Sequence, residues 1–294
     1  MNKDDGGFTR RDLVWGTLGA TLGAALLRGA PKEDAPRPAG KSRVILTRDK
    51  DVLNDKLDVD AVALKKMLNG AMTRLTGEKS ARDAWRALFK PGDVVGLVPT
   101  TALNATHAEL TDAVRTALMD IGIPEQNIRN VQRDMDGVKA STALLCMPAL
   151  KAHWLTGIGT VLKNYIMFSG EPRRYHDADS HNLGAIWNLP FIKGKTRLVL
   201  VDALTPLCDK GPQPDPRYRW PYKGLIAGTA PVAVETVGLR VILKKREGMR
   251  GEPWPLSPPP LCVEAADKDH GLGTSRWEAI ELVRMGWGED ALIA

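Results

Sequence analysis

Residues 144–168 read LLCMPALKAHWLTGIGTVLKNYIMF, and the fold can be predicted from this stretch outward. The apolar run over residues 142–147 indicates a buried strand that ends at Pro148. A short polar loop and a predicted helix over the second half of the stretch complete a βα unit. Ligands of open α/β sheets bind beyond the carboxyl ends of the strands, so we expect a site where this strand gives way to the helix.

The junction between that strand and that helix is polar. It carries two lysines, an imidazole and a carboxamide: Lys151, His153, Lys163 and Asn164. Such a set suits a small anionic ligand, a carboxylate or a phosphate, and Gly157 and Gly159 would let the backbone approach it closely. The alternative is that Lys163 points into solvent and that Asn164 bonds the backbone, and the residues alone weigh the two evenly.

Other apolar runs predict further strands. Residues 43–48 and 94–98 each indicate one, and residues 279–283 indicate a closing strand. Residues 197–201 form another apolar run, which ends in Asp202. Doubly wound folds place ligand-facing or metal-facing carboxylates at such strand ends, so Asp202 is expected near the polar junction.

Capping residues predict where helices begin. Asp58 and Ser80 can each cap a helix, and Pro231 suits the first turn of a later one. Residues 106–109 (Thr-His-Ala-Glu) form a capping box that opens a helix to residue 120. His107 could face the site from that first turn, but a surface histidine is the more common outcome and the one expected here.

The alternation of strands and helices predicts an α/β fold, a mostly parallel sheet with helices on both faces. No internal repeat is found, and no linker after residue 42 divides the chain. Residues 43–294 are therefore expected to form a single domain.

Residues 175–182 (YHDADSHN) form the best candidate metal loop, with two imidazoles and two carboxylates. His176, Asp179 and His181 could ligate zinc, iron or manganese. A mixed site in which His153, His181 and Asp202 converge is an alternative. No HExxH register fixes these ligands, and polar loops with histidines are common, so an ordinary loop is favoured over a metal site.

Composition excludes several classes of function. The net charge of +6 is spread without long basic runs, so nucleic acid binding is not expected. The three cysteines lack CxxC or metal-ligand spacing, so no iron–sulfur cluster or structural zinc is expected within this chain. GxSxG, GxGxxG and GxxxxGK[ST] motifs are absent, which excludes the familiar serine hydrolase and nucleotide-binding signatures.

The N-terminus resembles an export signal. Residues 9–14 (TRRDLV) place two arginines before a weakly hydrophobic, uncharged stretch over residues 13–27, as in twin-arginine (Tat) signals. Residues 1–30 are therefore interpreted as a Tat signal or anchor, and the Pro-rich residues 31–42 as a linker. The expected location is periplasmic or extracytoplasmic. The cleavage site is poor, so an uncleaved segment could also anchor the protein to the inner membrane.

With these residues in view, the chain resembles the DUF362 family, a group without an assigned function. The resemblance is carried by KPGDVVGL (90–97), MPALKAH and TGIGTVLKN (within 147–164), IKGKTRLVLVDAL (192–204) and TAPVAVETVGLRVI (229–242). Two departures stand out. Glu235 occupies a position where relatives are expected to carry aspartate, and the chain lacks the cysteines of the ferredoxin-like module that many relatives contain.

The resemblance implies a site at the polar junction, with His153, Lys163 and Asp202 as catalytic residues and Lys151 and Asn164 as ligand-binding residues. The first functional hypothesis is an exported enzyme or redox accessory that acts on a small anion. A divalent metal is its candidate cofactor, the Tat translocase its partner during export, and a redox protein a further candidate partner. The second hypothesis is a non-catalytic exported binding or assembly protein, in which the same pocket holds an anion or cofactor for a partner.

Overall fold

The computed structural model describes residues 40–177 and 180–293. The described residues belong to one compact unit, which spans Ala39–Ala294. The predicted signal, residues 1–30, and most of the predicted linker lie outside the described residues. Among the described helices, none is both long enough and apolar enough to cross a membrane.

This unit is an α/β structure built on one sheet. Its strands are β1 (Ser42–Arg48), β2 (Val95–Pro99), β3 (Ile128–Asn130), β4 (Ala143–Met147), β5 (Ala149–His153), β6 (Gly157–Ile158), β7 (Thr196–Leu207), β8 (Gly224–Gly228) and β9 (Ile280–Gly286). Its α-helices are α2 (Ala61–Thr76), α3 (Ala81–Leu88), α4 (Ala108–Asp120), α5 (Met135–Ala140), α6 (Leu183–Trp187), α7 (Pro231–Arg250) and α8 (Leu261–Lys268). Its 3-10 helices are η1 (Glu125–Asn127), η2 (Leu162–Ser169), η3 (Arg174–His176), η4 (Ser180–Asn182) and η5 (Trp277–Ala279).

The sheet has the strand order β3-β2-β4-β7-β8-β1-β9, and β5 pairs with β7 beyond the end of β4. Parallel pairs join β2 to β3 and β4, β7 to β4 and β5, and β1 to β9. Only β8, between β7 and β1, and the short β6 run antiparallel to their neighbours among the described strands. The prediction of a mostly parallel sheet is confirmed.

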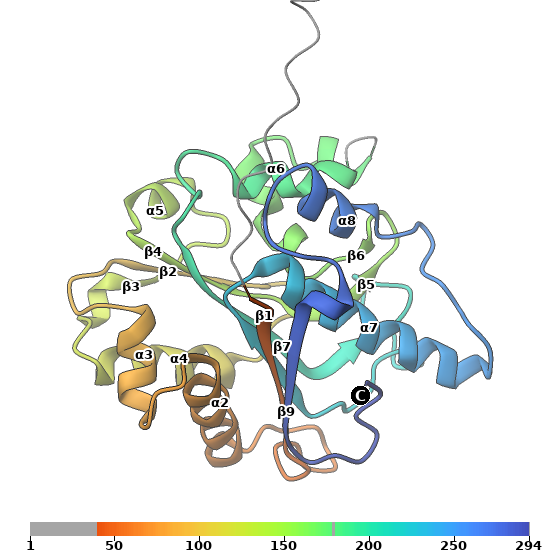
Figure 1. Ribbon diagram of the computed structural model, residues 1–294, viewed down its shortest axis with the longest axis horizontal. Helices are drawn as coiled ribbons and strands as arrows, with labels where there is room; N and C mark the ends of the chain where they lie inside the picture. Colours follow the sequence, from red (N-terminus) through yellow and green to blue (C-terminus); the bar gives the residue numbers. More distant parts are fainter. Residues whose placement is uncertain (1–39, 178–179, 294) are drawn as a thin grey trace, which may run out of the picture. The chain divides into compact units, whose positions relative to one another are not determined.

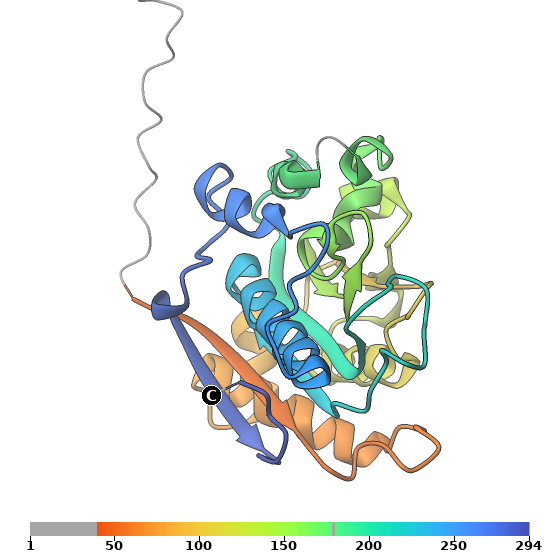
Figure 2. The same ribbon diagram turned by 90° about the vertical axis from the view of Figure 1, so that its right-hand side faces the viewer.

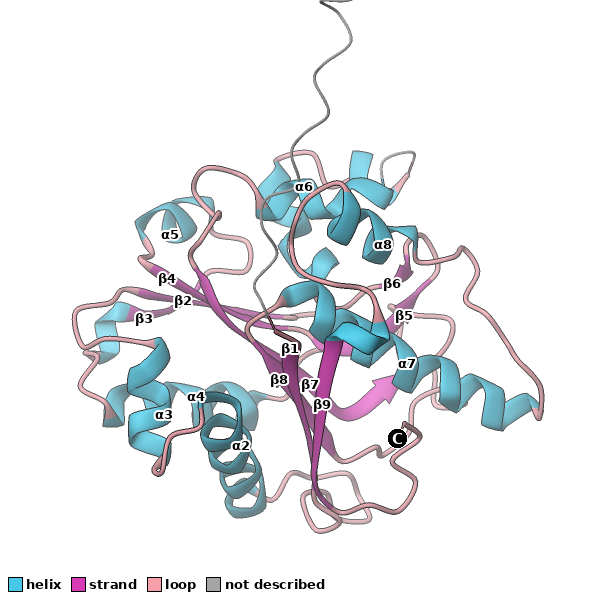
Figure 3. Cartoon of the chain, in the orientation of Figure 1, coloured by secondary structure: helices cyan, strands magenta, loops and turns pink. Residues whose placement is uncertain are grey.

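Helices cover both faces of the sheet, as predicted (Figures 1 and 3). One core cluster packs α7, α8, α6 and η2 on one face, where Val237, Ile186 and Leu162 are buried. The other packs α2, α3 and α4 on the opposite face, where Leu64 and Trp85 are buried. Consecutive residues of the central strands alternate between the two clusters, as the two-residue period of a strand requires.

β4 ends at Met147, immediately before Pro148, as predicted, but the polar loop expected after the proline is a further strand. The proline carbonyl accepts a hydrogen bond from the Asp202 N–H at 2.8 Å, and the chain then continues as β5. β5 pairs with the second half of β7, with Ala149 opposite Asp202 and Lys151 opposite Leu207. Lys151 and His153 therefore lie on a strand, and the helix predicted to follow them is the 3-10 helix η2.

The predicted helix starts were right in part. Ser80 caps α3 by accepting from the Asp83 N–H at 3.1 Å. α2 begins two residues later than expected, because Asp60 rather than Asp58 caps it. The capping box at residues 106–109 is wrong, because the Thr106 hydroxyl donates to the Met147 carbonyl at 2.6 Å. Thr106 thus joins the loop after β2 to the end of β4.

Candidate functional site

The carboxyl ends of β2 and β4 meet the middle of β7. Pro99 of β2 and Met147 of β4 are paired, and the chain leaves both strands beside Asp202. Thr100 begins the loop after β2, and its hydroxyl oxygen accepts from the Ala149 N–H at 3.3 Å. The loops of two βα units are thereby held against each other at the edge where ligands of parallel sheets bind.

Lys151 projects from β5 into this edge and is almost fully buried, with 4% of its surface exposed. Its ammonium donates to the Thr100 hydroxyl at 3.4 Å and to the Asn104 carbonyl at 3.2 Å. Burial, helped by the charge of Lys163, lowers the pKa of Lys151 to about 7, and the charge of Asp202 opposes this shift. Close to neutral pH this lysine is therefore poised between its charged and neutral forms.

Lys163 lies on η2, and burial lowers its pKa to about 8. The two lysines repel each other, and neither forms an ion pair within the described part of the chain. Two ammonium groups whose charges interact, and which bond no carboxylate among the described residues, leave a positive charge that an anionic ligand can neutralise.

Asn164, next to Lys163, is buried and structural as well as close to the site. Its amide donates to the Val98 carbonyl at 2.6 Å and lies 3.4 Å from the Cys146 sulfur. Its carbonyl oxygen accepts from the Thr100 hydroxyl at 3.5 Å. The alternative that Asn164 bonds the backbone is thus confirmed. The same bonds fix the start of η2 against the end of β2.

His153 lies at the end of β5, 5% exposed, and its ring stacks on His176 with centroids 5.5 Å apart. Its Nδ1 accepts from the Leu155 N–H at 3.2 Å. Burial, then the charge of Lys163, lowers the pKa of His153 to about 2, so its ring is neutral at physiological pH. A neutral imidazole with one nitrogen engaged can offer its other nitrogen as a hydrogen-bonding group.

The chain itself fills the space beside the two glycines. Gly157 has φ +75°, and a Cβ there would lie 2.6 Å from the Pro258 carbonyl oxygen. A Cβ on Gly159 would lie 3.0 Å from the Cβ of His153. The close approach that these glycines allow is therefore to protein, and it packs β6 and the start of η2 against their neighbours.

His107 was expected at the surface, and the structure corrects this. It precedes α4, and its Nδ1 lies 2.7 Å from the Asp202 Oδ2, which also accepts from the His107 N–H at 2.7 Å. The other carboxylate oxygen accepts from the Leu204 N–H at 3.0 Å. The His107 Nε2 lies 3.4 Å from the Thr205 hydroxyl, which accepts from Arg219 at 2.7 Å.

The pKa of His107 is raised by these contacts. Burial is the largest influence and lowers the pKa, but the hydrogen bond and the charge of Asp202 together outweigh it. Asp202 thus holds a histidine by both ring and backbone, in the arrangement that orients acid–base histidines. The strand-end position of Asp202 was visible in the sequence, whereas its partner lies 95 residues away and was missed.

The predicted metal ligands are not brought together within the described residues. His176 stacks on His153, His181 is exposed on η4, and Asp179 lies outside the described part of the chain. No group of three histidine, cysteine, aspartate or glutamate side chains among the described residues is placed to hold a metal. In the alternative mixed site, both oxygens of Asp202 already accept hydrogen bonds from the chain. The metal site therefore stays a prediction.

Comparison with known proteins gives one match. A family model described as "Domain of unknown function (DUF362)" matches residues 64–240. The matched range runs from α2 into α7 and contains Lys151, Lys163, His107 and Asp202. No curated protein and no solved structure matches the chain.

Proposed function

This chain belongs to the DUF362 family, and from that premise we propose that it is an enzyme acting on a small anion, a carboxylate or a phosphate. Lys163 and Lys151 bind the anion at the edge formed by β2, β4 and β5. Lys151 and the His107–Asp202 pair exchange protons with it. The supporting observation is the buried Lys151 ammonium, which among the described residues bonds a hydroxyl and a carbonyl, and whose pKa the charge of Lys163 lowers.

The roles differ from those expected from sequence. Asp202 orients His107 and is too occupied to act directly on the ligand. Lys151 has the pKa of about 7 that suits a general acid or base, so it joins the catalytic set. Lys163 keeps the role of binding the negative charge of the ligand, and the neutral His153 contributes a hydrogen bond to the ligand. A non-catalytic protein that binds the same anion remains the second hypothesis.

Anion binding is tested by calorimetry of the full chain with inorganic phosphate and with short dicarboxylates. At about pH 8 the neutral Lys151 takes up a proton when an anion binds, so the observed heat should depend on the ionisation enthalpy of the buffer. Lys163→Ala should weaken binding at least about tenfold, because it removes one of two partly desolvated charges. Lys66→Ala, at an exposed position of α2, is the matched control.

Absence of binding by every anion in the panel would contradict the proposal. Equal weakening by Lys163→Ala and Lys66→Ala would contradict it as well, since it would show general attraction to a basic protein. Binding without proton uptake would favour the non-catalytic hypothesis, because Lys151 would then not change its charge with the ligand.

Export by the Tat route is the second part of the proposal, supported by the paired arginines of residues 9–14 and the uncharged stretch that follows. Changing Arg10 and Arg11 together to lysine is expected to leave the protein in the cytoplasm while the unchanged chain reaches the periplasm. Cell fractionation and immunoblotting measure the distribution. Arg43→Lys, outside the signal, should export normally, and undiminished export of the double variant would reject the Tat assignment.

A further inference from the structure

The outer edge of the sheet at β9 carries a cavity of about 530 Å³ that the proposed function does not use. β9 pairs with β1, and no described strand lies on its other side (Figure 2). Every residue from Leu282 to Gly288 lines the cavity. Side chains of both faces take part: Leu282 packs with one core cluster, Val283 and Met285 with the other. Only the edge of a strand adjoins both faces, so the cavity follows the free edge of β9.

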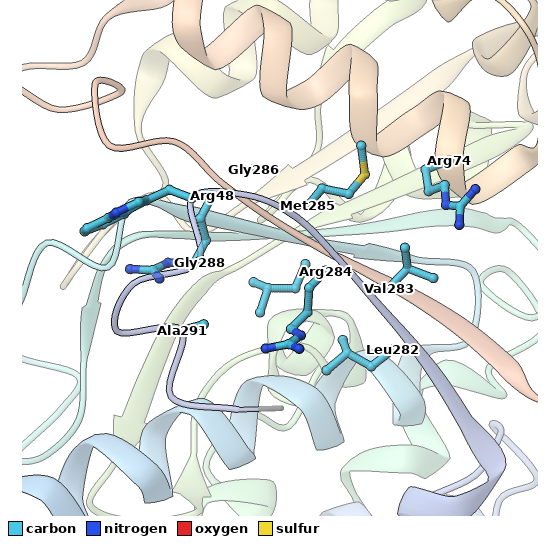
Figure 4. Close-up of a pocket in the computed structure, with 11 residues that line it drawn as sticks. Arg48, Arg74, Leu282, Val283, Arg284, Met285, Gly286, Gly288 and Ala291 are labelled. Carbon is cyan, nitrogen blue, oxygen red and sulfur yellow. The ribbon is translucent and has the colours of Figure 1, made fainter.

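The charge along this edge is positive. Arg48, Arg74 and Arg284 line the cavity, and no aspartate or glutamate does so among the described residues. Figure 4 shows the Arg48 and Arg284 side chains on one side of β9 and Arg74 on the other, beside Met285. Glu281, on the same strand, is bonded to Arg43 at 2.9 Å and so is already occupied.

Arg48 is fixed in place before any ligand arrives. It is 3% exposed, and its guanidinium lies between the rings of Tyr222 and Trp287 at 4.3 and 4.4 Å from their centroids. Its Nε donates to the Tyr222 carbonyl at 2.9 Å, and a second nitrogen donates to the Glu289 carbonyl. Among the described contacts, Asp290 forms no hydrogen bond with Arg48 and affects the pKa of Arg48 only through its negative charge. A cation held this rigidly loses little side-chain entropy on binding.

We infer that the free edge of β9 binds an extended acidic segment of a partner protein as an added strand. Backbone N–H and C=O groups of such a segment pair with the open edge of β9, which is the mode of strand addition. Its side chains alternate between the two faces, so acidic residues on one face meet the exposed Arg284, with the buried charge of Arg48 behind it, and those on the other meet the exposed Arg74. The cavity follows seven consecutive residues, Leu282 to Gly288, and this length of chain suits an extended peptide.

A second copy of this chain is a poorer occupant. Symmetric pairing of β9 with β9 would bring the same arginines from both copies together across one interface. Like charges opposite each other on neighbouring strands are destabilising. Charge complementarity therefore selects a negatively charged partner over self-association.

The test uses the full chain and fluorescein-labelled short peptides of alternating valine and glutamate, with binding measured by anisotropy at about 50 mM and about 300 mM salt. The glutamate peptide should bind at least about tenfold tighter than its glutamine counterpart, and more weakly at the higher salt. A glutamate peptide with alternate amides N-methylated keeps the charge but cannot pair as a strand, so its binding should be lost.

Variants locate the site. Arg284→Glu and Arg74→Glu should each weaken binding of the glutamate peptide about tenfold or more, whereas Arg133→Glu, on an exposed loop, should change it little. Arg284→Gln serves if the charge reversal lowers the melting temperature. Strand addition would be overturned if the N-methylated or the glutamine peptide bound as tightly as the glutamate peptide. It would also be overturned if Arg133→Glu weakened binding as much as Arg284→Glu, or if succinate displaced the peptide with an affinity similar to that of the peptide. Concentration-dependent dimers that mask the edge would overturn the choice of partner.

Discussion

Replacing Lys151 with methionine is expected to make the protein more stable at pH 7 and to abolish anion binding. The pKa of Lys151 is about 7 in the folded protein and 10.5 for an unperturbed lysine. A difference of that size corresponds to roughly 4–5 kcal/mol of destabilisation by the buried charge. Methionine fills a similar volume without a charge. The Asn104 carbonyl loses its donor at a cost of about 1–3 kcal/mol, so the net gain is about 1–4 kcal/mol.

The gain should depend on pH with a defined sign. Between pH 7 and 10.5 the unfolded chain keeps the Lys151 proton and the folded protein has released it. The unfolded state therefore binds more protons, and the stability of the unchanged protein rises with pH over this window. The advantage of Lys151→Met is greatest below about pH 7 and shrinks as the pH approaches that of a free lysine.

Urea unfolding at several pH values from about 6 to 10 measures this difference. Lys66→Met, at an exposed position of α2, is the control and should show no pH-dependent difference. A constant difference between Lys151→Met and the unchanged chain across the range would mean that Lys151 titrates like an ordinary surface lysine. A buried charge that ligand binding requires lowers the stability of the folded protein, which is a common trade-off between stability and function.

Five of the nine described strands, β1, β2, β4, β7 and β9, were predicted from their apolar runs, whereas β3, β5, β6 and β8 were not. β2, β4 and β8 are fully buried, and the first two were predicted within one residue of their bounds. β5 was missed because Ala149–His153 alternates small or apolar residues with Lys151 and His153. Polar side chains in that pattern normally indicate an exposed loop, and only tertiary packing against β7 buries them here.

The sequence identified candidate residues at this edge of the sheet but did not predict the hydrogen bonds between them. Asp202 was identified because the end of a buried strand is visible in local sequence. His107 was assigned to the surface because its partner approaches from β7, far along the chain. Long-range polar contacts leave no periodic signal, so local patterns place a group at the right edge of a sheet without saying what it bonds.

Asp202 connects the two halves of the site, because it holds His107 and also raises the pKa of Lys151 through its charge. Asp202→Asn is therefore expected to alter three things together. It removes the acceptor of two bonds from His107, it lowers the pKa of His107, and it lowers the pKa of Lys151 further. A buried carboxylate whose oxygens all serve such contacts is a positioning residue for its neighbours.

The loss of stability caused by Asp202→Asn is expected to be about 3–5 kcal/mol, because the new amide faces two donors that were bonded to a carboxylate. The pKa of His107 is raised in the folded protein, so its charged form contributes stability that is present below the ordinary histidine pKa of 6.5. That contribution is lost as the pH rises through the folded pKa. The destabilisation should therefore be larger near pH 5.5 than near pH 8, with a remainder at high pH from the backbone bonds to Asp202.

A double-mutant cycle with His107→Gln and Asp202→Asn separates the pair from its surroundings, with unfolding measured at both pH values and His107 followed by NMR titration. The coupling energy should exceed about 1 kcal/mol at the lower pH and fall at the higher one. In Asp202→Asn the pKa of His107 should drop below that of the unchanged protein, since burial would then act unopposed by the carboxylate. Equal coupling at both pH values would show that His107 is neutral throughout. Asp202 would then stabilise the fold only through its hydrogen bonds to backbone N–H groups, and His107 would have no extra proton to donate to a ligand.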